Sequence, residues 1–157
     1  MAIASAFHLG FNEDALAQAR EALKKACELA DVIVAPGDLF DARVPRQEVI
    51  LDALRLFDEF RQFNSGKAKV RIVGENGVER SASSCIIGIH GTHERRSRGM
   101  ANPVNLLDSV DLLVDAHSRK VLVEINGEKV VVQGMGGVPE EFAKRAIKLL
   151  DFKPVDG

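Results

Sequence analysis

The first 38 residues alternate between two kinds of apolar pattern. Residues 2–7 form a short apolar run, and residues 32–35 form a second one that ends at Pro36 and Gly37. Between them, with Asn12 or Asp14 available as the N-cap, apolar residues recur at the spacing of one helix face, at Leu16, Ala19, Leu23, Ala26 and Ala30. Strand, helix and strand in this order predict a β-α-β unit with parallel strands, which places the chain in the α/β class.

The same alternation continues in the middle of the chain. A helix is predicted over residues 47–63, and strands are predicted over 69–73 and 85–89. The stretch GENGVERSASS between these two strands is predicted to be a polar loop. Phe60 and Phe63 near the end of the helix either close the core or face a partner.

The last third predicts two helices, a strand and a hairpin. A short helix is expected near residues 104–107 and a strand over 110–114. The segment KVLVEINGEKVVVQG predicts a β-hairpin, because Asn126-Gly127 suits a type I′ turn between two alternating runs. Pro139 and Glu140 open a last helix whose apolar face carries Phe142, Ala146, Ile147 and Leu150.

Composition limits the classes of protein to consider. The chain of 157 residues is long enough for one domain, and its 46% apolar residues contain neither a membrane span nor a leader peptide, so a cytoplasmic location is expected. Cys27 and Cys85 lie far apart without a CxxC motif, which excludes a thiol-rich zinc site. The net charge of −2 argues against a generally basic nucleic-acid surface, so any phosphate must be held locally.

Three strand ends carry histidine or aspartate. His8 follows the first strand, Asp38 follows the second within GDLFD, and His93 follows a later strand within GIHGTHERRSRG. Each has a common structural explanation on its own: a lone histidine, a Gly-Asp turn, or a solvated charged loop. Together they point to one edge of a parallel sheet, where ligands bind. Histidine nitrogen and carboxylate oxygen suit Mn²⁺, Fe or Zn²⁺, and arginines beside such a site suit phosphate.

The blocks FHLG, GDLFD and GTHERR, in this order, resemble the calcineurin-like metallophosphoesterase superfamily. PGDLFD, HGTHERRSRG and NPVNLL are most similar to the archaeal Mre/SbcD-type nucleases that repair DNA double-strand breaks. The resemblance implies a layered sheet flanked by helices and hydrolysis of DNA phosphodiesters with two Mn²⁺ ions. It also implies DNA ends, a coiled-coil ABC-type ATPase and a second copy of the chain as partners, without a membrane, at the nucleoid.

The resemblance also assigns roles to residues of the three blocks. It makes His8 a ligand of one metal ion, Asp38 the bridging ligand and His93 the catalytic histidine. Thr92 stands where the family has an asparagine ligand, so its hydroxyl either substitutes for that ligand or the ligand is lost.

The residues around these blocks receive supporting roles. Asp41 is expected to order the loop after Asp38, and Glu94 to pair with an arginine or to orient His93. DNA phosphates would be held by Arg95, Arg96 and Arg98. His90 is interpreted as a loop residue.

The chain also departs from the family pattern. Ala6 occupies the position of a metal-binding aspartate, and no histidine follows His117, which fits neither of the two late histidine blocks. We therefore expect residues 1–157 to form a single metallophosphoesterase-like domain, an N-terminal portion that ends in a hairpin and a helix and is incomplete at its C-terminal end. Its metal site would be weak or partial, and its nuclease activity impaired.

Two other functions remain compatible with the sequence. A degenerate member of the same fold could bind DNA ends, or scaffold the ATPase, without cutting. The metal-binding blocks alone also fit a phosphodiesterase of small substrates, because they do not fix the size of the substrate.

Overall fold

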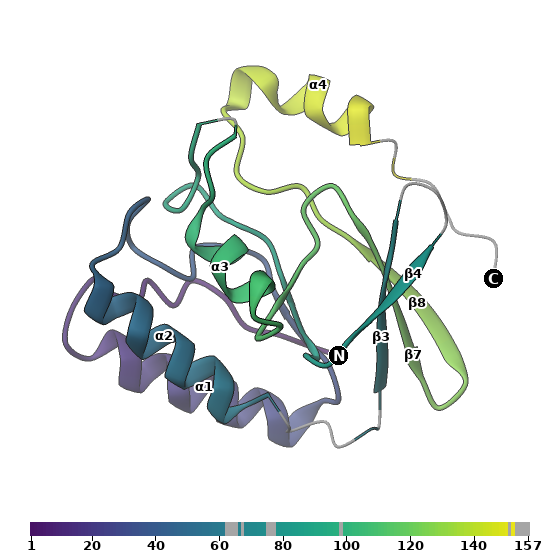
Figure 1. The fold of residues 1–157 in the computed structure, drawn as a ribbon, viewed down its shortest axis with the longest axis horizontal. Helices are drawn as coiled ribbons and strands as arrows, with labels where there is room; N and C mark the ends of the chain where they lie inside the picture. Colours follow the sequence, from purple (N-terminus) through teal and green to yellow (C-terminus); the bar gives the residue numbers. More distant parts are fainter. Residues whose placement is uncertain (62–65, 67, 75–77, 98, 151, 153–157) are drawn as a thin grey trace.

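The computed structural model consists of two four-stranded sheets and four helices in the part of the chain that it describes (Figure 1). The described residues are 1–61, 66, 68–74, 78–97, 99–150 and 152. None of the helices in these residues is long and apolar enough to cross a membrane. The prediction of an α/β fold is confirmed.

The first sheet is parallel and contains the predicted β-α-β unit. Its strands are arranged in the order β1-β2-β5-β6, and their bounds are Ala2–Ile3, Ile33–Ala35, Ile86–Gly88 and Val114–Asp115. Helix α1 (Ala15–Leu29) joins β1 to β2. Asp14 is the N-cap residue of this helix, and Asn12 supports the helix start, since its Oδ1 accepts hydrogen bonds from the backbone N–H groups of Ala15 at 2.8 Å and Asp14 at 3.1 Å.

Two predicted strands are shorter than the apolar runs suggested. The first strand ends at Ile3 instead of residue 7, because Ala6 and His8 have positive φ angles of 58° and 45°. The strand predicted over 110–114 is reduced to β6, and Asp111 before it has a φ of 58°. Left-handed backbone cannot continue a strand, so these residues form loops instead.

The second sheet is antiparallel, with the order β4-β3-β7-β8. Its strands are β3 (Ala68–Val73), β4 (Glu79–Ala82), β7 (Lys120–Ile125) and β8 (Glu128–Gln133). The hairpin β7-β8 is confirmed, and its turn residues Asn126 and Gly127 both have positive φ, as a type I′ turn requires. The prediction of a polar loop at 79–82 is wrong, because these residues form β4 at the sheet edge.

The two sheets and three of the four helices form three layers. One core lies between the parallel sheet and helices α1, α2 (Gln47–Glu59) and α3 (Pro103–Ser109), and includes Ile33, Ile86 and Leu113. A second core lies between the two sheets and includes Ile87, Val114, Val70, Val121 and Val123. The sheet residues of β5 alternate between these cores, which fixes its register.

Helix α2 is shorter than predicted, and helix α4 has no buried residue. Helix α2 ends at Glu59, and Phe60 is buried in the core, which favours its packing role over a partner surface. Phe63 lies outside the described residues. Helix α4 (Glu140–Leu150) forms as predicted and lies apart from the other three helices (Figure 1). None of its residues is buried, and Phe142 and Ile147 on its apolar face are exposed.

Candidate metal centre

The loops after β1, β2 and β5 meet at one edge of the parallel sheet. These loops carry His8, Asp38 with Asp41, and His93. The backbone N–H of His8 donates to the carbonyl oxygen of Asp38 at 3.1 Å, which holds the first two loops together. Parallel strands bring the loops at their carboxyl ends together, as the sequence predicted.

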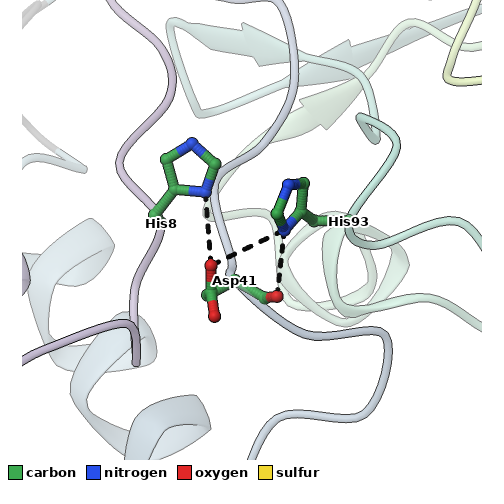
Figure 2. Close-up of side chains that lie close together, drawn as sticks. All are labelled: His8, Asp41 and His93. Atoms are coloured by element: carbon green, nitrogen blue, oxygen red, sulfur yellow. Dashed lines mark hydrogen bonds and ion pairs between the residues drawn. The ribbon is translucent and has the colours of Figure 1, made fainter.

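Three side chains at this edge converge, and we call His8, Asp41 and His93 the His–Asp cluster (Figure 2). The carboxylate Oδ1 of Asp41 lies 3.6 Å from Nδ1 of His8 and 3.6 Å from Nδ1 of His93. One ligand atom from each residue lies within 4.8 Å of the other two. Ligands of a tetrahedral metal ion, each about 2.1 Å from it, are separated by about 3.4 Å, so two of the three spacings suit one ion.

A polar atom without a hydrogen bond supports this fit. The Nδ1 atom of His8 is buried and has no hydrogen-bond partner among the described residues. Its separation of 3.6 Å from the Asp41 carboxylate is too long for a hydrogen bond. A buried histidine nitrogen facing a carboxylate across such a gap can accept a cation between them.

Asp38 takes part in a different set of contacts from Asp41. Its Oδ1 accepts the backbone N–H of His93 at 3.1 Å and lies 3.5 Å from the hydroxyl of Thr92. Gly91 packs so closely that a Cβ atom there would lie 2.2 Å from this oxygen. The structure therefore brings Asp38 and Thr92 together beside the cluster, while Asp41, expected only to order the loop, lies between the two histidines (Figure 2).

Glu94 joins two of the site's loops through their backbones. Its fully buried carboxylate accepts N–H groups from Gly91 at 2.7 Å, Phe40 at 2.8 Å and Asp38 at 3.1 Å. Three charge-assisted hydrogen bonds of this kind make a strong, directional connection. Glu94 thus fixes the loop after β2 against the loop after β5, which carries His93, and no ion pair between Glu94 and an arginine is found among the described residues.

The exposed His93 ring has a pKa above its ordinary value. The main cause is a hydrogen bond with the backbone oxygen of Asp41, 3.1 Å from Nδ1, and the carboxylates of Asp38, Asp41 and Glu94 add to it against a smaller opposing effect of burial. A raised pKa means that a larger fraction of His93 carries a proton near neutral pH. The ring can therefore donate a proton to a bound anion, and a metal ion must compete with that proton.

The arginines predicted to bind phosphate follow His93 in the sequence. Arg95 and Arg96 are half-buried, and Arg96 donates to the backbone oxygen of Ala101 at 3.3 Å. Arg98 lies outside the described residues.

Ala6 has a backbone conformation that is unusual for alanine. Its N–H donates to the carbonyl oxygen of Gly37 at 3.2 Å, and its φ of 58° is left-handed. Aspartate and asparagine tolerate this conformation better than alanine does. The local backbone would therefore suit an aspartate, the residue that the resemblance predicts at this position, whereas the alanine present offers no metal ligand.

A second histidine pair, which sequence reasoning missed, lies beside this edge. The rings of His90 and His117 meet edge to face with centroids 4.6 Å apart, and Gly136 packs against the His90 ring. The N–H of Gly136 donates to Nδ1 of His117 at 2.9 Å. Burial, with lesser contributions from His117 and Arg95, lowers the pKa of His90 to about 4, so this ring is neutral at pH 7. The glycines of GMGG were the only sequence signal of such close packing.

The fold and the His–Asp cluster define an α/β protein with a candidate three-donor metal site at the strand ends. No model of a known protein family matches the chain, and no match is found among the curated proteins.

Proposed function

We propose that the chain binds one divalent metal ion of the Mn²⁺, Fe or Zn²⁺ class at the His–Asp cluster and uses it to hold a DNA phosphodiester, which it hydrolyses poorly. The observation that carries the proposal is the convergence of three donor atoms within 4.8 Å at the carboxyl edge of a parallel sheet. The choice of DNA follows from the resemblance of FHLG, GDLFD and GTHERR to the Mre/SbcD-type nucleases.

The chain's own residues supply three parts of such chemistry. A bound ion would polarise the phosphoryl group and activate water. His93, whose pKa is raised, holds a proton in the absence of the ion and would give up that proton to act as a ligand. Asp38 and Glu94 fix the loop of His93 through backbone hydrogen bonds. Arg95 and Arg96 offer planar donors to phosphate oxygens.

Poor hydrolysis is expected because a second ion lacks donors in the described part of the chain. Ala6 provides no ligand, and the hydroxyl of Thr92 faces the Asp38 carboxylate. Two-metal hydrolases use both ions to stabilise the attacking and the leaving oxygen. With one ion, we expect the chain to bind DNA but to hydrolyse it slowly.

The test is the affinity for a short fluorescent DNA duplex with and without Mn²⁺. We expect Mn²⁺ to raise the affinity of the wild type about tenfold, which corresponds to about 1.4 kcal/mol for one additional charged contact. Asp41→Asn should lose this gain. Asp58→Asn, which removes an exposed carboxylate 3.2 Å from Arg61, should keep it.

Three outcomes would count against the proposal. Binding of DNA that ignores Mn²⁺ in all three proteins would place the chain among the non-catalytic DNA-binding modules. Robust cleavage of DNA would contradict the expected impairment. Hydrolysis of bis-p-nitrophenyl phosphate without DNA affinity would favour the small-substrate phosphodiesterase.

The resemblance also suggests protein partners. We include a coiled-coil ABC-type ATPase and a second copy of the chain in the proposal. Sedimentation of the chain alone should reveal a dimer, and a purely monomeric chain at high concentration would remove the homodimer from it.

A further inference from the structure

A second hollow lies next to the His–Asp cluster along the chain. It has a volume of about 300 Å³, and we call it the arginine hollow. Its lining residues are Arg43, Val44, Arg95, Arg96, Ser97 and Met100. Arg43 is the one arginine among these lining residues to which the sequence analysis assigned no role.

Three arginines line the hollow and give it a positive charge. Within the described residues, no carboxylate forms an ion pair with Arg43, Arg95 or Arg96. The guanidinium of Arg96 donates only to the backbone oxygen of Ala101 and to the sulfur of Met100 there. Cations gathered in a concavity repel one another and focus the field on an anion that enters it.

Two of the three loops that form the His–Asp cluster also form the arginine hollow. Arg43 follows Asp41 by two residues, and Arg95 follows His93 by two residues. Two residues of extended chain span at most about 7 Å, so the backbones of the two sites are close neighbours. An anion bound in the hollow would therefore lie close to an anion bound at the His–Asp cluster.

The rim of the hollow is apolar. The side chains of Val44 and Met100 are 68% and 56% exposed. Apolar contact beside guanidinium groups suits a phosphate attached to a sugar and base better than a bare inorganic anion.

We propose that the arginine hollow binds a backbone phosphate of a nucleic-acid strand, adjacent to the phosphate held at the His–Asp cluster, and that Arg43 is a DNA-binding residue. The inference rests on the proposed function for the identity of the ligand as DNA. Its geometry depends on the arginines alone, so it can be tested without metal. Guanidinium groups can grip such a phosphate by paired hydrogen bonds.

The experiment measures the affinity of a fluorescent DNA oligonucleotide at several salt concentrations in the presence of EDTA. The proteins are the wild type, Arg43→Ala, and the control Arg55→Ala, which removes an exposed arginine of α2 with the same change of charge. Arg43→Ala should weaken binding about five- to tenfold and lower the slope of log affinity against log salt by about 0.7–0.9. Arg55→Ala should stay within about twofold of the wild type.

The other outcomes overturn the inference. If both variants lose the same affinity, or if Arg43→Ala binds like the wild type, the hollow is not a phosphate site. Absence of DNA binding by the wild type in EDTA also overturns it. If calorimetry shows that Arg43→Ala weakens the binding of inorganic phosphate but leaves the affinity for DNA unchanged, the hollow binds free phosphate instead. Failure of the Mn²⁺ test alone would remove the metal-dependent function and leave this result standing.

Discussion

Replacing Glu94 by alanine is expected to lower the free energy of unfolding by about 3–5 kcal/mol. The carboxylate is fully buried and accepts the N–H groups of Gly91, Phe40 and Asp38. Alanine would leave these donors without their partner and would open a cavity between two loops. Each unsatisfied buried donor costs about 1–3 kcal/mol, partly recovered where water enters.

Urea unfolding of three variants would check this expectation. Glu94→Gln retains one acceptor oxygen but turns an amide N–H₂ toward at least one donor, so it should lose less stability than Glu94→Ala, about 2 kcal/mol. Glu13→Ala removes an exposed glutamate before α1 and should change the free energy of unfolding by less than about 0.5 kcal/mol. A Glu94→Ala protein within about 1 kcal/mol of the wild type would contradict the role assigned to this carboxylate.

Replacing His90 by phenylalanine is expected to make the protein more resistant to acid. The pKa of His90 is lowered to about 4 in the folded protein, mainly by burial, whereas an unfolded histidine titrates near pH 6.5. The unfolded chain therefore takes up the proton at a higher pH than the folded protein does. The contribution of His90 to the free energy of unfolding is fully present above pH 6.5 and is lost as the pH falls toward 4. The loss from this residue amounts to about 2 kcal/mol at pH 5.

The measurement is the difference in unfolding free energy between His90→Phe and the wild type at pH 7 and pH 5. Because Nδ1 of His90 has no hydrogen-bond partner among the described residues, an apolar ring should cost less than about 1 kcal/mol at pH 7. At pH 5 the balance should shift by about 2 kcal/mol in favour of the variant. The same difference at both pH values would show that His90 does not titrate abnormally.

The general plan of the fold follows from local patterns. Apolar runs flanking a period of 3.6 gave the β-α-β unit, and Asn126-Gly127 gave the hairpin. Strand β4 was missed because an edge strand facing water shows no apolar alternation; its residues Glu79 and Arg80 are exposed. The ends of β1 and β6 were misplaced because residues in the left-handed conformation, such as Ala6 and Asp111, do not interrupt the apolar runs from which strands are predicted.

The location of the candidate site was predictable from the sequence, but most contacts between its residues were not. Topology brings the loops of His8 and His93 together whatever their details. The choice between Asp38 and Asp41 depends on the backbone, since Asp38 has a φ of 52° and contacts the N–H of His93 instead of joining the cluster. The His90–His117 pair depends on contacts between segments far apart in the sequence, which a single sequence does not reveal.

The most direct test of the metal centre is a calorimetric titration of the chain with Mn²⁺. We predict that one ion binds per chain, and that binding is lost in Asp41→Asn and retained in the matched variant Asp58→Asn. Absence of binding, two ions per chain, or a site that survives in Asp41→Asn would contradict the assignment of the metal centre to His8, Asp41 and His93.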